Sequence, residues 1–234
     1  MKTRVFLITA KTNLHVGNES GGEFTIIDKA IQRDPLTQLP CINSSSLKGA
    51  IKEYCVHKAK LDNVKKLFGS DVDKDGKIIN NKSEDTQKGD AIFFDAKLLY
   101  LPQQDKNNLF SYITSKQVID AMNERVKLFV PSFEYKENPK INGHNVEVKD
   151  TNDKLASCCN DDNLPIIARN VLENGESKNL WYEQVLPAET VLYTIIQEKN
   201  EDLLNALDGK IVQIGAGATI GYGYCKFECI NKEG

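Results

Sequence analysis

The sequence predicts an α+β fold in which helices cover one face of a β-sheet. Two observations support this class. Segments with the two-residue alternation of strands and segments with the helical spacing of apolar residues follow one another along the chain. The 234 residues are also 40% hydrophobic and 27% charged, which is normal for a soluble globular protein with a substantial core. No internal repeat is visible in the sequence, so we expect one domain covering residues 1–234.

The first strand is expected at residues 3–14, where apolar and polar residues alternate around Val5–Ile8. A helix should then run from Ser44 or Ser45, which are good N-caps, to about Lys60. A second helix is predicted from about Ser115 to Lys127. The remaining predicted strands are residues 91–101, stopped by Pro102, and residues 190–197, 210–214 and 222–230.

Two regions, residues 70–89 and 135–178, are polar and rich in turn-forming residues. We expect both to be insertions of loop or thumb-like form. Within the second, KINGHNVEVK (residues 140–149) predicts a small hairpin around Asn-Gly. Without these insertions, the order of elements and the glycine-rich C-terminal loop fit a modified RNA-recognition (ferredoxin-like) fold.

The charge balance excludes a globally basic protein, because the net charge is −3 and the sequence pI is about 5.7. Binding to a nucleic acid would therefore require a local basic face. No apolar run approaches the roughly 20 residues of a membrane-spanning helix. The six cysteines form no C-x-x-C pair, and the histidines lack zinc-finger spacing. We expect reduced thiols, no membrane partner and a cytoplasmic location.

The start of the first helix is one candidate binding site. Unpartnered backbone N–H groups at a helix N-terminus attract anions. The hydroxyl groups of Ser45 and Ser46 add donors there, and Lys48 and Lys52 add cations. This pattern suits RNA phosphates, but on residue type alone simple N-capping of an ordinary helix is the better interpretation of the serines.

The segment QIGAGATIGYGYCKF (residues 213–227) is a second candidate. Glycines allow a backbone to approach a phosphate chain closely. A strand follows this segment, so it is neither the dinucleotide fingerprint nor a nucleotide-hydrolysing loop, both of which open a helix. A glycine-rich turn without a ligand remains the alternative. The glycines concerned are Gly215, Gly217, Gly221 and Gly223.

Three further residues or segments carry possible chemistry. Asp28 lies in a loop, where a carboxylate can bind Mg²⁺ beside a phosphate or orient a 2′-hydroxyl, although most loop carboxylates are only solvated. His15 could act as an acid or base, or as a structural histidine. Residues 71–78, DVDKDGKI, match the start of a calcium loop, but Lys82 stands where the bidentate glutamate belongs. A solvated acidic turn is the better interpretation of that segment.

Taken together and in order, six segments resemble the RAMP superfamily of CRISPR effector proteins. The similarity is greatest to the repeated backbone subunit of type III-B (Cmr) complexes. It runs from about residue 5 to residue 227, with poor matches at residues 70–89 and 135–178. The segments are NLHVG, IIDKAIQRDPLTQLPCINSSSLKGAIK, LFGS, AIFFDAKLLYLP, LWYEQVLPAETVLY and VQIGAGATIGYGY.

The resemblance implies a modified RNA-recognition fold and a helical filament of identical subunits along a guide RNA, together with other subunits of the complex. A hairpin thumb would interrupt the guide–target duplex at regular intervals, where the target RNA would be cut in a metal-dependent reaction. The catalytic aspartate of the superfamily falls on Asp28, which would either hold Mg²⁺ or position the 2′-hydroxyl. The guide backbone would lie along Ser45, Ser46 and Lys48 and near the glycine loop, with Arg33 as a further phosphate contact.

The sequence departs from the superfamily pattern at two points. Asn43-Ser44 stands where Pro-Gly usually precedes the serines, and Tyr222 stands where the glycine loop usually carries an arginine. Three alternatives stay open. The chain could be a guide-binding subunit that never cuts, a stand-alone guide-processing endoribonuclease that uses His15, or a calcium-binding protein that uses Asp71–Asp75.

Overall fold

The computed structural model describes residues 1–17, 27–70 and 88–231. The calcium-like segment at residues 71–78 lies outside these ranges. One curled sheet has the order β11-β12-β1-β10-β4-β5-β7-β6, with β2 on β4 and β3 on β10. Its strands are β1 (Lys2–Ala10), β2 (Cys41–Ile42), β3 (Ile92–Phe93), β4 (Ala96–Gln103), β5 (Ser111–Ser115), β6 (Lys140–Ile141), β7 (His144–Lys149), β10 (Val191–Glu198), β11 (Ile211–Gln213) and β12 (Tyr224–Cys229).

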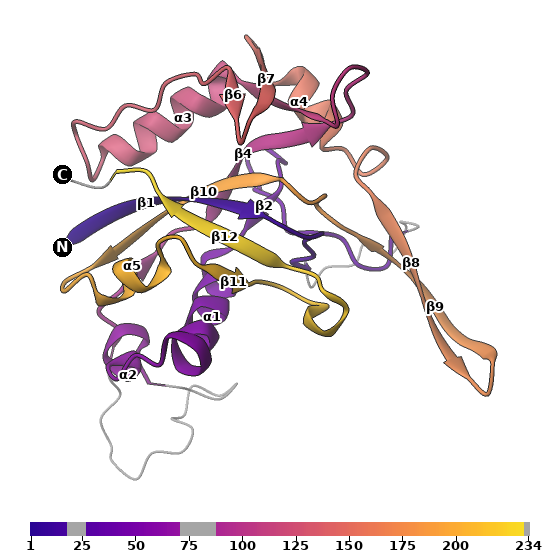
Figure 1. Cartoon of the computed structure of the whole chain (residues 1–234), viewed down its shortest axis with the longest axis horizontal. Helices are drawn as coiled ribbons and strands as arrows, with labels where there is room; N and C mark the ends of the chain where they lie inside the picture. The colour runs from indigo at the N-terminus through magenta and orange to yellow at the C-terminus, as the bar shows by residue number, and fades with distance from the viewer. Residues whose placement is uncertain (18–26, 71–87, 232–234) are drawn as a thin grey trace.

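Helices lie on both sides of this sheet, not on one face as the sequence suggested (Figure 1). On one side are α1 (Ser44–Tyr54), α2 (Val64–Phe68) and α5 (Asp202–Leu207). On the other are α3 (Lys116–Lys127) and the short α4 (Asp153–Cys158). All eight residues of β10 are buried, which requires cover on both faces of the central strands.

The centre of the sheet is the antiparallel pair β1–β10, which stays in register from Lys2↔Glu198 to Thr9↔Val191. Strand β12 pairs with the other edge of β1 and places the glycine loop beside the end of β1. Phe6 and Phe227 meet edge to face at 6.0 Å between ring centroids, inside the core. The C-terminal strands are therefore fixed to the N-terminal strand by packing as well as by hydrogen bonds.

Two local predictions are confirmed. Helix α3 occupies the region predicted from about Ser115 to Lys127, and Ser115 is found to cap it, because its Oγ accepts a hydrogen bond from the backbone N–H of Val118 at 3.2 Å. Strands β6 and β7 form the predicted hairpin, with φ of +49° at Asn142 and +83° at Gly143. The predicted stop at Pro102 is wrong, since β4 continues past it and Pro102 pairs with Tyr112.

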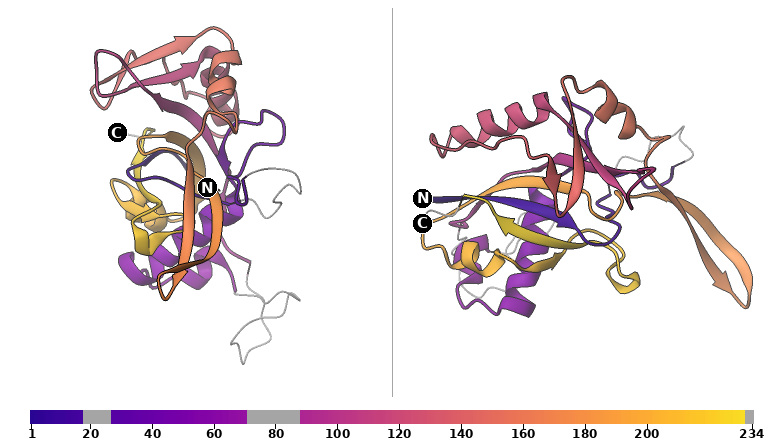
Figure 2. Two further views of the ribbon diagram at one scale, coloured as in Figure 1. Left: turned by 90° about the vertical axis from the view of Figure 1, so that its right-hand side faces the viewer. Right: turned by 45° about the horizontal axis from the view of Figure 1, so that its top comes forward.

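A separate two-stranded hairpin, β8 (Ile166–Glu173) and β9 (Glu176–Gln184), extends away from the sheet (Figures 1 and 2). It overlaps the region predicted as an insertion, residues 135–178. The sequence alone did not reveal its strands. Most of its described residues are exposed, so the hairpin lacks the one-sided apolar alternation that marks a strand on a core.

None of the six cysteines, all of which lie in the described residues, forms a disulfide bond. Burial raises the pKa of Cys225 to about 12, so its thiol is protonated at neutral pH and serves packing. Among the described residues, no helix is long and apolar enough to cross a membrane.

Candidate nucleic-acid interface

Asp28 lies at the root of the β8–β9 hairpin and is exposed. Its backbone N–H donates to the Tyr182 carbonyl at 3.1 Å, and its Oδ2 accepts from the Tyr182 N–H at 2.7 Å. The neighbouring Lys29 forms an isolated parallel bridge with Glu183. The segment that carries Asp28 is thus fastened along β9, and the carboxylate is fixed in place while remaining open to solvent.

His15 connects this hairpin root to the glycine loop. Its Nδ1 lies 2.7 Å from the Gln184 carbonyl, and its own carbonyl accepts from the Ala216 N–H at 2.9 Å. The residue as a whole is only 3% exposed. These contacts give His15 a structural role. The buried ring has little access to an RNA strand, which argues against an acid–base role.

Gln32 joins the same frame to the start of α1. Its Nε2 donates to the Gly17 carbonyl at 3.2 Å and to the Ser46 Oγ at 3.0 Å. Its Oε1 accepts from the Asn43 N–H at 2.7 Å. The loop between Asp28 and α1 is therefore an ordered connection that brings two of the predicted sites into one rigid framework.

Arg33 is already engaged within the chain. Its guanidinium donates to the Gln38 carbonyl at 2.9 Å and to Asp161 at 2.8 Å, and its side chain is 18% exposed. A phosphate would have to displace Asp161, which is well exposed. Its role as a phosphate contact stays a prediction.

Asp34, the next residue, stabilises the turn that precedes α1. Its carboxylate accepts from the Leu36 and Thr37 N–H groups and pairs with Lys97. Burial raises the pKa of Asp34, but the Lys97 and Thr37 hydrogen bonds outweigh this and lower it to about 2. Arg33 and Asp34 thus both hold the turn before α1 in its shape through their hydrogen bonds to its backbone.

The N-cap of α1 is Asn43, so the prediction of Ser44 or Ser45 as the cap is wrong. The Ser44 N–H donates to Asp95 Oδ1 at 2.8 Å. The helix start therefore already faces a carboxylate from the segment between β3 and β4. That negative charge opposes a phosphate at the same place, although Lys97 lies 3.4 Å from Asp95 and partly offsets it.

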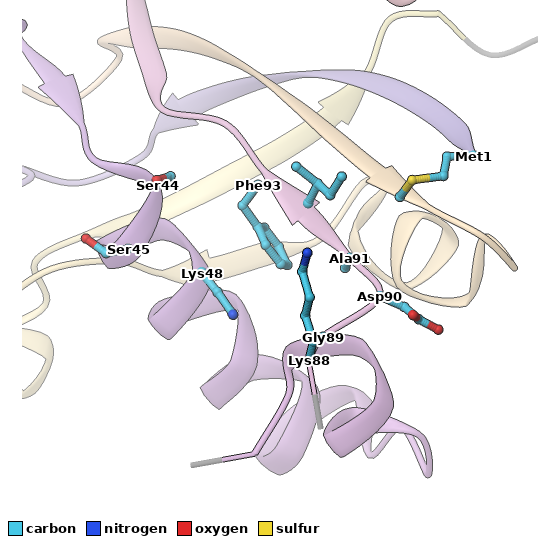
Figure 3. Close-up of a pocket in the computed structure, with 10 residues that line it drawn as sticks. Met1, Ser44, Ser45, Lys48, Lys88, Gly89, Asp90, Ala91 and Phe93 are labelled. Carbon is cyan, nitrogen blue, oxygen red and sulfur yellow. The ribbon is translucent and has the colours of Figure 1, made fainter. Parts of the chain in front are cut away.

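A cleft of about 550 Å³ lies beside this helix start (Figure 3). Ser45 and Lys48 line it from α1, and Lys88 and Phe93 line it from the segment that faces α1. Lys88 was missed in the sequence because it is 40 positions from Lys48 and belongs to a region predicted as an insertion. Lys52 is half-buried on α1, and its RNA role stays a prediction.

The glycines of the C-terminal loop all have positive φ, between +76° and +82°. For two of them the fold itself requires glycine. A Cβ on Gly215 would lie 2.1 Å from the His15 carbonyl oxygen, and a Cβ on Gly223 would lie 1.9 Å from the Ile214 carbonyl oxygen. A Cβ on Gly217 would lie 3.1 Å from the Tyr222 Cβ, which is closer than an ordinary contact, whereas a Cβ on Gly221 would meet nothing within 4 Å.

Similarity to known proteins places this geometry in a family. The sequence profile described as the RAMP superfamily matches residues 7–226. The chain belongs to the RAMP superfamily. The resemblance seen in the sequence is confirmed.

Individual members of the superfamily match nearly the whole chain. The CRISPR system Cmr endoribonuclease Cmr4 of Pyrococcus furiosus is 25% identical over 291 aligned positions, which cover 97% of this chain and 95% of the relative. A chain in a cryo-EM structure of an apo type III-B Cmr-beta complex superposes with a TM-score of 0.75 at 19% identity, covering 98% of this chain and 97% of the other. Oligomeric Cmr4 of Pyrococcus furiosus superposes with a TM-score of 0.69 at 18% identity and 98% coverage of both chains. These likenesses confirm the predicted fold class.

Among the RAMP chain's described residues, no three His, Cys, Asp or Glu side chains gather as a metal site. Mg²⁺ commonly binds through one or two carboxylates together with water and phosphate oxygens. The exposed carboxylate of Asp28 fits that type of site, in which the RNA supplies further ligands. Metal binding at Asp28 stays a prediction.

Sequence reasoning also missed a cluster of cations and aromatic rings at the hairpin root. Lys29 Nζ lies 4.9 Å from the Trp181 ring, and the Arg169 guanidinium lies 4.6 Å from the Tyr222 ring. In this RAMP chain a cation therefore does reach the end of the glycine loop, but it comes from β8. Of these residues, only Tyr222 was singled out in the sequence, because it stands where the superfamily usually has an arginine.

Proposed function

We propose that the chain is a backbone subunit of a type III-B CRISPR effector complex, which binds guide RNA and cleaves complementary target RNA through Asp28. Copies of the subunit would lie side by side along the guide in a helical filament, with other subunits of the complex, in the cytoplasm. The β8–β9 hairpin would be the thumb that interrupts the duplex at regular intervals.

The observation that carries this proposal is the setting of Asp28. An exposed carboxylate is fixed by two backbone hydrogen bonds at the root of a protruding hairpin. A carboxylate held in this way needs little reorganisation when a substrate arrives. The name of the Pyrococcus furiosus relative, an endoribonuclease, supports RNA cleavage as the chemistry.

The proposed reaction is an attack of a target 2′-hydroxyl on the adjacent phosphate. A bond forms from the 2′-oxygen to phosphorus, and the bond from phosphorus to the 5′-oxygen breaks. The 2′-hydroxyl proton leaves, and the departing 5′-oxygen takes up a proton. Asp28 either orients the 2′-hydroxyl or contributes a ligand for a divalent ion. A bound Mg²⁺ would neutralise charge that develops on the phosphate.

The guide strand is assigned to the start of α1 and to the adjacent cleft. Ser45, Lys48 and Lys88 line one cleft and offer hydroxyl and ammonium donors at a helix start. Contacts of this type read the RNA backbone, so base pairing with the guide would supply sequence specificity. The glycine loop would follow the same strand at Gly217, which is half-buried, and at Gly221, which is exposed.

A second candidate function is a guide-binding subunit that does not cut. The observation that favours it is that Asp28 is already hydrogen-bonded to the backbone of Tyr182 at both its N–H and its carboxylate, which gives the side chain a structural role without any metal. In that case the complex would bind target RNA normally, and chelation or replacement of Asp28 would change nothing.

The test uses the complex reconstituted on a guide RNA with its partner subunits and labelled complementary target RNA. We expect regularly spaced cuts with Mg²⁺, no cuts with a chelator, and the loss of a single cut when the target carries a 2′-deoxynucleotide there. The Asp28→Ala variant should bind target and leave it intact. Wild-type complex that binds target without cutting would select the second candidate.

The guide-binding assignment is tested separately. Lys48→Ala should weaken guide binding, whereas Lys106→Ala, an exposed lysine between β4 and β5, should not. Removing one phosphate contact should lower the dependence of log affinity on log salt by about one. An equal effect of the two variants would show only a loss of general positive charge.

A further inference from the structure

Three segments that are distant in sequence meet at the base of the β8–β9 hairpin. They are the Asp28-Lys29 segment, the paired strands of the hairpin, and the glycine loop with Tyr222. Glu183 on β9 accepts from Arg169 Nε at 3.1 Å and lies 3.5 Å from Lys29 Nζ. The face of the Arg169 guanidinium packs on the Tyr222 ring at 4.6 Å. Arg169 thus contacts both the hairpin carboxylate and the glycine loop.

Arginine is suited to this double contact. Its planar guanidinium can donate from an edge to a carboxylate while its face stacks on an aromatic ring, and lysine cannot do both. Glu183 has an 11% exposed side chain. Its burial raises its pKa, but the Arg169 hydrogen bond and the nearby His15, Trp181 and Lys29 outweigh this and lower it. The carboxylate is therefore ionised when it pairs with Arg169.

Arg169 Nη2 is buried and has no hydrogen-bond partner among the residues that the structure describes, and Nη1 of Arg125 shares this feature. A buried donor without a partner is costly, but it does not by itself set Arg169 apart. What sets Arg169 apart is its double contact at the hairpin root, where the guanidinium is held between Glu183 and Tyr222. Glu183 is the chain neighbour of Tyr182, whose backbone hydrogen-bonds to Asp28.

We propose that Arg169 is a positioning residue for target cleavage, which locks the hairpin root onto the glycine loop through Tyr222. Asp28 is hydrogen-bonded to Tyr182, the neighbour of Glu183 on the same strand. Holding Glu183 and the hairpin against Tyr222 therefore fixes the direction in which the Asp28 carboxylate faces the RNA. Arg169 acts through these contacts and does not touch the reacting atoms. The inference rests on the proposed nuclease function.

The first test reports on the lock in the free protein and needs no cleavage. Trp181 is the one tryptophan of the chain and sits opposite Arg169 in the hairpin. Quenching of its fluorescence by acrylamide should rise in Arg169→Lys and in Tyr222→Leu. It should stay at the wild-type level in Tyr222→Phe, which keeps the ring face. Unchanged quenching in the first two variants would overturn the lock.

The second test measures cleavage in the reconstituted complex at saturating target. Arg169→Lys and Tyr222→Leu should each slow single-turnover cleavage about tenfold, because small misplacements of a catalytic group have effects of this size. Target affinity should change less than about twofold, since no RNA contact is removed. The double variant should be no slower than the slower single variant, because both changes break one contact.

Arg125→Lys is the matched control, since Arg125 also packs on aromatic rings, 5.8 Å from Phe94 and 5.9 Å from Tyr193, but away from the hairpin. It should leave the cleavage rate unchanged. Raised quenching with a wild-type cleavage rate would overturn the positioning role while the nuclease function stands. If wild-type and Asp28→Ala complexes bind target and neither cuts, the nuclease function fails and the positioning role fails with it. The quenching result still decides whether the lock exists.

Discussion

Alanine substitutions in the glycine loop should separate glycines that the fold requires from one that RNA can use. A Cβ at Gly223 would lie 1.9 Å from the Ile214 carbonyl oxygen, and one at Gly215 would lie 2.1 Å from the His15 carbonyl oxygen. A Cβ at Gly221 meets nothing within 4 Å. All three residues have similar positive φ, so they share the same backbone penalty and differ only in their neighbours.

The magnitudes follow from these two contributions. A left-handed backbone costs a non-glycine residue about 1–2 kcal/mol, which is the whole expected loss of stability for Gly221→Ala. For Gly215→Ala and Gly223→Ala, the backbone atoms must also move apart, as in an overpacked core. We expect a total loss of roughly 2–5 kcal/mol for each of these two variants.

The assay is urea unfolding of the free chain, followed by guide-RNA binding for each variant that folds. The urea concentration at the unfolding midpoint should fall strongly for Gly215→Ala and Gly223→Ala and only slightly for Gly221→Ala. The dependence of the unfolding free energy on urea concentration should be similar in all three variants. Gly221→Ala should then report on RNA contact alone. If Gly221→Ala destabilises the chain as much as Gly223→Ala does, the steric reasoning is wrong.

Three further predictions concern charges near the start of α1. Asp34→Asn should destabilise the chain by about 2 kcal/mol at neutral pH, because Lys97 and nearby donors lower the pKa of Asp34 to about 2. This contribution to stability is present above pH 4 and disappears as the pH falls through 2. Urea unfolding at several pH values measures it. Asp95→Asn should keep a hydrogen bond to Ser44 but remove the charge that opposes phosphate, so guide affinity at low salt should rise roughly two- to fivefold in a filter-binding titration. Lys88→Ala should weaken guide binding and reduce its salt slope by about one, measured over a salt series.

Each of these predictions has a control in the same chain. Asp150→Asn breaks a pair with Lys116 that is largely exposed; Lys116 also lowers the pKa of Asp150, but solvent screens the pair, so the acid dependence should be much weaker than that of Asp34→Asn. A constant stability difference between wild type and Asp34→Asn down to pH 2 would contradict the pKa argument. Lower guide affinity in Asp95→Asn would mean that the Asp95 charge supports the interface. Lys106→Ala serves as the control for Lys88→Ala.

The sequence revealed features whose causes are local. The helix that begins after Ser115 and the hairpin turn at Asn142-Gly143 were predictable because the residues that form them are neighbours in the chain. The end of β4 was not, because Pro102 pairs with Tyr112 in an environment that its neighbours do not specify. The α+β class followed from periodicity, whereas cover on both faces of β10 depends on how distant helices pack.

The candidate site was predictable only in part, for the same reason. Asp28 and Lys48 lie in segments that carry the superfamily resemblance, so they could be named from the sequence. The carboxylate that faces the start of α1 comes from Asp95, 51 positions after Ser44, and the cation beside Tyr222 comes from Arg169. Contacts between residues so far apart are set by the sheet topology, which a single sequence does not specify.

The most direct test of the central claim compares Asp28→Asn with Asp28→Ala in the reconstituted complex. Asparagine can still accept the hydrogen bond from the Tyr182 N–H, but it carries no charge and is a poor ligand for Mg²⁺. Single-turnover cleavage should fall by a factor of at least about 10³ in both variants, with target binding retained. Cleavage by Asp28→Asn at the wild-type rate would contradict the account, because the carboxylate would then have only a structural role.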